Sequence, residues 1–76
     1  MKRVAITGGG GYIGGQTAIY FKEQGWEVTS IDRNPFPEHL SSFVDYCIYD
    51  DFYSKSAIDR YMWCDTIIHC AGSSLV

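Results

Sequence analysis

The chain has 76 residues, 46% of them hydrophobic and 20% charged, and its formal net charge is −3. This length allows one small domain spanning residues 1–76, and the mixed composition argues against disorder. The six basic residues form no stripe that would bind a phosphate backbone, and no apolar run approaches the roughly 20 residues of a membrane span, so we expect a cytoplasmic protein without nucleic-acid or membrane partners.

The first half of the chain predicts two strands and a helix. Residues 3–7 are an apolar run that stops at four consecutive glycines, which is typical of a buried strand that ends in a tight turn. Residues 12–24 change to helical spacing, and Gly25 is expected to end this helix. Residues 26–31 predict a second strand, with Asp32 at its carboxyl end. The helix face expected to be buried carries Ile13, Thr17, Tyr20 and Phe21.

The second half predicts a loop, two more strands and a shorter helix. Residues 33–42 contain two prolines, which indicate an irregular loop. Residues 43–49 predict the third strand and residues 65–70 the fourth. Ser54 is the expected N-cap of a helix that runs to about Met62. The helix side expected to face the sheet carries Ala57, Ile58, Tyr61 and Met62.

The alternation of strands and helices predicts an α/β fold. We expect a partial Rossmann fold, which is a doubly wound parallel sheet, with about four strands in the order 3-2-1-4 and two helices. Ligands bind such sheets outside the carboxyl ends of the strands. The candidate functional residues are therefore those that follow the predicted strands.

The cysteines and histidines show no metal-ligand spacing. Cys47, Cys64 and Cys70 are odd in number and lack a C-x-x-C pair, which argues against a disulfide framework or a zinc site. We interpret them as small buried thiols, and we expect no metal. His69 lies in an apolar strand pattern, where a structural imidazole is favoured over a catalytic one.

The glycine run after the first strand predicts a phosphate-binding turn. It fits both Gly9-x-Gly11-x-x-Gly14 and the longer Gly8-x-x-Gly11-x-x-Gly14. In both, a turn leads into a helix N-terminus, where free N–H groups and the helix dipole attract a pyrophosphate. Gly8 is expected to turn the chain, Gly11 to let the backbone approach phosphate oxygens, and Gly14 to let the helix pack closely. No G-K-[ST] follows the glycines, which excludes a P-loop.

Asp32 and Arg33 bear on the choice of cofactor. A carboxylate at the end of the second strand accepts hydrogen bonds from the ribose hydroxyls of NAD and repels the additional phosphate of NADP. Arg33, in contrast, offers a partner for that phosphate. Because the phosphate would then lie beside an ionised Asp32, NAD is favoured as the cofactor.

Several stretches resemble one known family. Residues 7–14 resemble the T-G-G-x-G-Y-I-G stretch of UDP-glucose 4-epimerases, and Asp32 matches their ribose-binding aspartate. Asp51-Phe52 resembles the pair that borders the adenine ring, a place that Asp50 takes if the register shifts by one. Residues 65–72 resemble the D-x-V-I-H-x-A-G segment that closes over the cofactor. The chain therefore resembles the NAD-dependent epimerases and dehydratases of the extended short-chain dehydrogenase/reductase superfamily.

This resemblance implies a cofactor site and a reaction. In the full-length parent, a hydride passes from a sugar carbon to NAD and returns with inverted configuration. The family's catalytic Tyr-x-x-x-Lys is absent, because none of the six tyrosines is followed by lysine four residues later. Ser74 stands where many UDP-glucose 4-epimerases have lysine, which leaves the substrate open. The residues implied to bind NAD are Gly8, Gly11, Tyr12, Ile13, Gly14, Asp32, Arg33, Asp51, Phe52, Cys70, Ala71 and Gly72.

These expectations leave three hypotheses. The first is an N-terminal, NAD-binding fragment of a sugar-nucleotide epimerase that is inactive alone, with a sugar nucleotide as partner only of the full-length parent. The second is a fragment of a related dehydratase or reductase. The third is an NAD(H)-binding regulatory or scaffold module without catalysis. In each case the fourth strand's edge and the faces at Ile67 and Ile68 lack cover, so we expect self-association.

Overall fold

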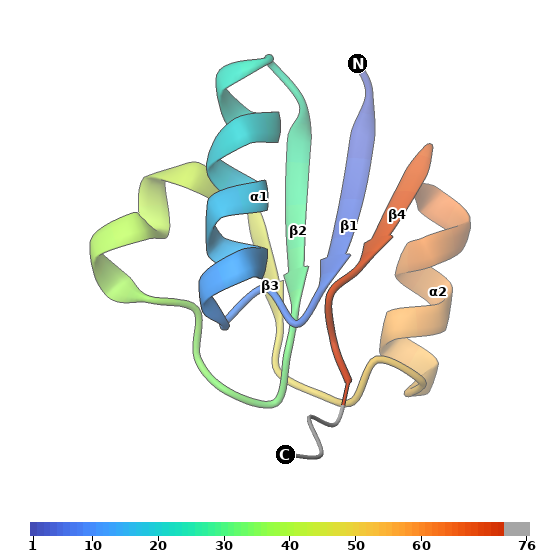
Figure 1. The fold of residues 1–76 in the computed structure, drawn as a ribbon. Helices are drawn as coiled ribbons and strands as arrows, with labels where there is room; N and C mark the ends of the chain where they lie inside the picture. The colour runs from blue at the N-terminus through green and yellow to red at the C-terminus, as the bar shows by residue number, and fades with distance from the viewer. Residues whose placement is uncertain (73–76) are drawn as a thin grey trace.

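The computed structural model describes residues 1–72 and contains a parallel sheet of four strands in the order β3-β2-β1-β4. This confirms the predicted partial Rossmann sheet and its strand order. The elements are β1 (Arg3–Thr7), α1 (Tyr12–Glu23), β2 (Glu27–Ile31), the 3-10 helix η1 (Glu38–Phe43), β3 (Tyr46–Ile48), α2 (Lys55–Trp63) and β4 (Thr66–His69). α1 and η1 lie on one side of the sheet and α2 on the other (Figure 1).

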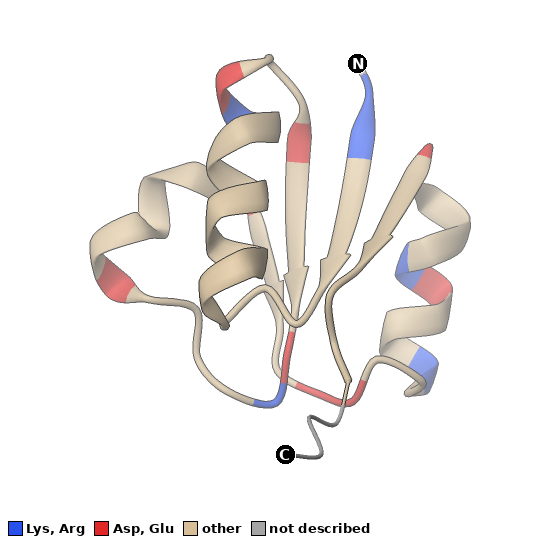
Figure 2. Cartoon of the chain, viewed as in Figure 1, with Lys and Arg blue, Asp and Glu red and all other residues tan. Residues whose placement is uncertain are grey.

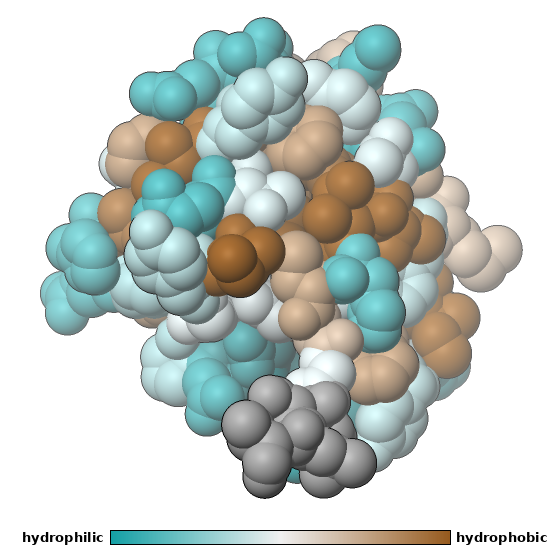
Figure 3. Space-filling view, in the orientation of Figure 1, coloured by the Kyte–Doolittle hydropathy of each residue, from teal (hydrophilic) through white to brown (hydrophobic). Residues whose placement is uncertain are grey.

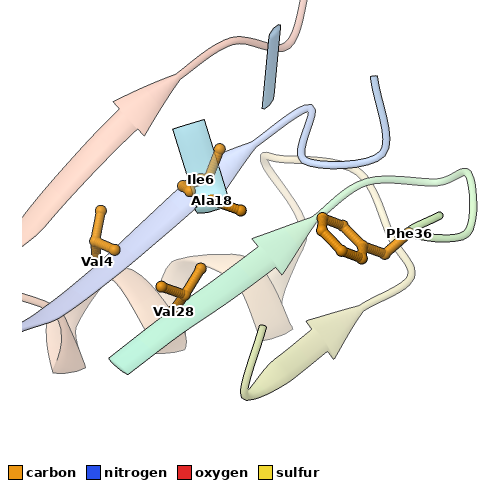
Figure 4. Close-up of a cluster of buried hydrophobic side chains, with 5 residues drawn as sticks. All are labelled: Val4, Ile6, Ala18, Val28 and Phe36. Carbon is orange, nitrogen blue, oxygen red and sulfur yellow. The ribbon is translucent and has the colours of Figure 1, made fainter. Parts of the chain in front are cut away.

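The central strand β1 is buried on both of its faces. It pairs with β2 on one side and with β4 on the other, which explains its unbroken apolar sequence. Ala5 faces α2 and packs with Ile31 and Ala57. The cluster on the α1 side consists of Val4, Ile6, Ala18, Val28 and Phe36 (Figure 4).

The buried face of α1 differs from the predicted one. Ile13 and Tyr20 are 65% and 59% exposed, whereas Gly14, Gly15 and Ala18 are buried. The helix lies so close to the glycine turn that only small residues fit between them: a Cβ atom at residue 14 would lie 2.7 Å from the Gly9 Cα. The prediction was therefore wrong for Ile13 and Tyr20, because closeness of approach decides which residues are buried, whereas Phe21 packs against the core cluster as predicted. The end of α1 is as predicted, since Gly25 follows its C-cap with a φ of +85°.

The helix α2 faces the sheet along a narrower line than predicted. Its N-cap is Ser54, as predicted, and the Ser54 hydroxyl accepts a hydrogen bond from the Ala57 N–H at 3.2 Å. Ala57 is buried and Tyr61, one turn further on, packs against the same cluster. Ile58 and Met62 are exposed, at 48% and 85%, and the prediction was wrong for both. Each is one position beyond an inward residue, which turns it by about 100° away from the sheet.

The segment between β2 and β3 contains more regular structure than predicted. η1 forms after Pro37 where an irregular loop was expected, and β3 has three residues instead of the predicted 43–49. Phe36 is only 8% exposed and Leu40 packs against the α1-side cluster. These two contacts hold the segment against α1, a long-range effect that proline content does not reveal.

Asp45 ties the start of β3 to β2 and α1. Its carboxylate accepts hydrogen bonds from the Val28 N–H at 2.8 Å and from the Lys22 Nζ at 2.8 Å. Partial burial raises the pKa of Asp45, but the bonds from Lys22 and from the Val28 amide outweigh it, so that the pKa lies below its ordinary value. The stabilisation is therefore complete above the unfolded-state pKa of about 3.9 and is lost as the pH falls through the folded-state value.

Asp45→Asn is expected to lower the free energy of unfolding by about 1 kcal/mol at neutral pH, since the bond to the Lys22 ammonium is lost. Asp59→Asn is the control, because Asp59 forms an exposed ion pair with Lys55. Urea denaturation at neutral and acid pH measures both. The loss of unfolding free energy caused by Asp45→Asn should be smaller at acid pH. A loss that is equal at both pH values would contradict this account.

Candidate functional site

A cavity of about 560 Å³ lies at the carboxyl ends of the strands. The loops that follow all four strands contribute to it, and acidic segments mark the loops after β2 and β3 (Figure 2). Most of the predicted site residues line it, namely Gly8, Gly11, Asp32, Arg33, Asp51, Phe52, Cys70, Ala71 and Gly72. Ile31, Asn34 and Tyr53 also line it but were not predicted, although each is a chain neighbour of a predicted residue.

The glycine turn begins at Gly8, where β1 ends. Gly8 has a φ of +71°, which confirms its predicted role in turning the chain. Its N–H donates to the Ile31 carbonyl at 2.7 Å, and its carbonyl accepts from the Gly11 N–H at 3.0 Å. A Cβ atom at residue 8 would lie 2.8 Å from the Ala71 N. The turn is therefore held between the end of β2 and the segment that follows β4.

The start of α1 presents backbone to the cavity. Gly11 is the N-cap and has no side chain to cap the helix, so the first-turn amides have no side-chain acceptor. Tyr12 and Ile13 do not line the cavity, and their side chains are 80% and 65% exposed. Gly14 is buried against the glycine turn and does not line the cavity either. These three predicted residues therefore do not line the cavity.

The Asp32 carboxylate is oriented by two backbone amides. Its Oδ2 accepts from the Gly10 N–H at 2.9 Å, and its Oδ1 accepts from the Asn34 N–H at 3.0 Å. A Cβ atom at residue 10 would lie 2.9 Å from the same Oδ2, so that glycine at this position permits the contact. Each carboxylate oxygen retains acceptor capacity for a ligand hydroxyl. This role of Gly10 was not predicted from the sequence.

Arg33 and Asp51 connect the loops after β2 and β3. The Arg33 Nε lies 3.1 Å from the Asp51 Oδ1, although the Arg33 side chain is 79% exposed. Asp50, the alternative to Asp51, also lines the cavity, but its carboxylate accepts a hydrogen bond from the Asp51 N–H at 2.8 Å. Both acidic residues therefore border the cavity, and Asp51 is the one that pairs with the arginine.

Aromatic side chains gather beside this acidic border. The Phe52 ring meets the edges of Tyr53 and His69, with ring centroids 5.1 Å and 4.8 Å apart. The Tyr61 hydroxyl of α2 donates to the Phe52 carbonyl and so holds the loop between β3 and α2 against that helix. Burial raises the pKa of Tyr61, which keeps the phenol protonated and able to donate.

Thr7, the last residue of β1, is hydrogen-bonded to the segment after β4 that lines the cavity. It is 1% exposed, and its Oγ1 lies 2.6 Å from the His69 Nδ1. The Cys70 and Ala71 N–H groups donate to the same oxygen at 3.1 Å and 3.2 Å. His69 is thus hydrogen-bonded as expected of a structural imidazole, although its side chain is exposed.

Cys47, Cys64 and Cys70 are all free thiols. They were predicted to be buried, but each is only half-buried. Burial raises the pKa of the Cys64 thiol. Within residues 1–72, no cluster of three His, Cys, Asp or Glu side chains suits a metal ion. No helix in this part of the chain has both the length and the apolarity of a membrane span. Ser74 lies outside the described residues.

A sequence model of the NAD dependent epimerase/dehydratase family matches residues 4–76. The chain belongs to this family. The resemblance found in the glycine turn and in the segment after β4 is thereby confirmed.

The chain is similar to part of two UDP-glucose 4-epimerases. A UDP-glucose 4-epimerase of Halalkalibacterium halodurans is 35% identical over 77 aligned residues, which cover 96% of this chain and 23% of that protein. A crystal structure of a UDP-glucose 4-epimerase from Stenotrophomonas maltophila, with bound NAD and formylated UDP-arabinopyranose, matches the fold with a TM-score of 0.80. Its sequence identity is 21%, and the match covers 100% of this chain and 26% of that one. The chain thus spans about a quarter of the length of these relatives.

Proposed function

We propose that the cavity at the carboxyl ends of the strands binds NAD, and that this chain is the N-terminal, NAD-binding part of a sugar-nucleotide epimerase similar to UDP-glucose 4-epimerase. The observation that carries the proposal is that the glycine turn, the Asp32 carboxylate and the segment after β4 face one cavity. Its volume lies in the usual range of cofactor sites. The family membership and the NAD bound to the solved relative support this assignment.

The residues present fit the successive parts of a dinucleotide. Backbone amides in the first turn of α1, which has no side-chain cap, provide donors for the pyrophosphate, without a lysine. Asp32 offers its remaining acceptor capacity to the ribose hydroxyls, and Asp51 and Phe52, which line the same cavity, would border the adenine. When bound, NAD supplies the hydride acceptor for oxidation of a sugar carbon. The chain's own residues bind and orient this cofactor, and the reacting sugar requires residues beyond them.

The Arg33–Asp51 ion pair favours NAD over NADP in this proposal. Asp51 engages the guanidinium that would otherwise be free to pair with a 2′-phosphate. Asp51→Asn is therefore expected to raise the NADP-to-NAD affinity ratio about tenfold, measured by calorimetry with both cofactors. The double variant with Arg33→Gln should lose that gain. An unchanged ratio in Asp51→Asn would contradict the proposed role of the pair.

Cofactor binding without turnover is the functional expectation for the chain alone. Calorimetry should detect saturable binding of NAD, whereas a coupled assay with UDP-glucose should detect no epimerisation, because the chain lacks Tyr-x-x-x-Lys. Measurable turnover by the purified 76-residue chain would overturn the second expectation. Failure to bind NAD would overturn the first.

The exposed side of β4 supports a proposal of self-association. Within residues 1–72, β4 pairs on one side only, and Ile67 is 48% exposed. Hydrophobic side chains also gather over β1 and β4 where α1 leaves the sheet uncovered (Figure 3). Sedimentation should show concentration-dependent association that Ile67→Glu weakens. A monomer at every concentration would contradict this expectation.

A further inference from the structure

The Thr7 hydroxyl has three polar neighbours, but it can donate its proton to only one of them. The Cys70 and Ala71 N–H groups lie 3.1 Å and 3.2 Å from its Oγ1, and backbone N–H groups only donate. A hydroxyl accepts at most two hydrogen bonds. These two amides therefore occupy its lone pairs, and its proton is left for the third neighbour, the His69 Nδ1 at 2.6 Å.

We infer that His69 is a positioning residue, held as the neutral tautomer with its proton on Nε2, whose Nδ1 accepts the Thr7 hydroxyl proton. This bond keeps both Thr7 lone pairs turned toward the Cys70 and Ala71 amides. The inference rests on the proposed function, because it assigns these amides to the wall of the dinucleotide site. His69 is not among the residues proposed to contact NAD. The inference deepens the proposed function because His69 holds the segment of Cys70 and Ala71, which are among those residues.

The wall and the glycine turn are in direct contact, which is why the position of these amides matters. The Ala71 N lies only 2.8 Å from the place that a Gly8 Cβ would take. The Cys70 N–H also donates to the Thr7 carbonyl, at 3.0 Å, so that both Thr7 oxygens hold the same segment. Thr7 is 1% exposed, and water cannot easily replace a lost partner there.

The surroundings of His69 leave its Nδ1 committed to Thr7. The His69 ring also packs against Phe52, which offers no hydrogen bond. None of the ion pairs within residues 1–72 includes His69, and the cavity that Asp50, Asp51 and Tyr53 line does not include it. The tautomer is therefore decided by the hydroxyl and not by a carboxylate.

Nitrogen-15 NMR of the labelled 76-residue chain tests the tautomer without any ligand. Spectra recorded at about pH 8.5, where a free imidazole is neutral, should show a proton-free Nδ1 and a protonated Nε2 for His69. His39→Gln assigns the two imidazoles. Thr7→Val should move both His69 nitrogen signals toward the averaged values of a free imidazole, and should leave His39 unchanged. A protonated Nδ1, or signals that do not respond to Thr7→Val, would overturn the inference.

NAD affinity tests the positioning role separately. His69→Asn places an amide oxygen near the former Nδ1 and should keep the affinity within about threefold, whereas His69→Leu should weaken it about tenfold. If the parent chain binds no NAD, the proposed function fails while the NMR result still decides the tautomer. If the parent chain and His69→Leu bind NAD equally, the positioning role fails and the proposed function stands.

Discussion

Gly14→Ala is expected to lower the free energy of unfolding by about 3 kcal/mol or more, the largest stability effect predicted for this chain. A Cβ atom at residue 14 would lie 2.7 Å from the Gly9 Cα and 2.8 Å from the Gly8 carbonyl carbon. Both contacts are with backbone, so no side chain can move aside to relieve them. A chain of this size has a total stability of about 4–11 kcal/mol, and a substantial unfolded population should follow.

Gly11→Ala is the matched control for this substitution. Gly11 has a φ of −85°, and a Cβ atom there would meet only the Gly8 carbonyl oxygen, at the ordinary distance of 3.5 Å. Stability should change by no more than about 1 kcal/mol. Because Gly11 lines the cavity, the added methyl group should nevertheless weaken NAD binding at least about tenfold. Thermal denaturation and calorimetry separate the two effects, and equal stability of the two variants would contradict the packing argument.

Asp32→Ala is expected to weaken NAD binding by about 30- to 100-fold, the largest expected effect on affinity. Hydrogen bonds to a charged group contribute about 1.5–3 kcal/mol, and the ribose hydroxyls lose this acceptor. The Gly10 and Asn34 amides lose the carboxylate as well, so the two loops should become less ordered. Calorimetry with NAD measures the affinity.

Asp59→Ala provides the control for charge. It makes the same change in net charge on the exposed surface of α2, away from the cavity. Its NAD affinity should equal that of the parent chain. If Asp32→Ala also retains the parent affinity, then Asp32 does not bind the ribose, and the cofactor assignment loses its most specific side-chain contact.

The parts of the fold that were predicted correctly are those that local chemistry decides. The apolar run of β1 requires burial on both faces, and Gly8 and Gly25 adopt the positive φ values that their positions in a turn and after a helix demand. Ser54 caps α2 because its hydroxyl reaches an amide three residues away. The strand order follows from the alternation of strands and helices.

The parts that were missed depend on contacts between distant segments. The buried side of α1 is set by how closely Gly14 approaches the turn, which hydrophobic periodicity does not record. The pairing of Arg33 with Asp51, which lie 18 positions apart in the sequence, joins two loops, and no local pattern indicates it. The hydroxyl of Thr7 meets His69 from a neighbouring strand. In each case, the residue type was visible in the sequence but its partner was not.

The most direct test of the central claim is a titration of the nitrogen-15-labelled 76-residue chain with NAD, followed by amide correlation spectra. The account predicts saturable shifts for the amides of residues 8–12, 32–34 and 70–72, which surround the cavity. The amides of residues 59–63 at the far end of α2 should stay unchanged. Absence of shifts at the glycine turn and at Asp32 when NAD is in excess, or shifts confined to α2, would contradict the assignment of this cavity as the NAD site.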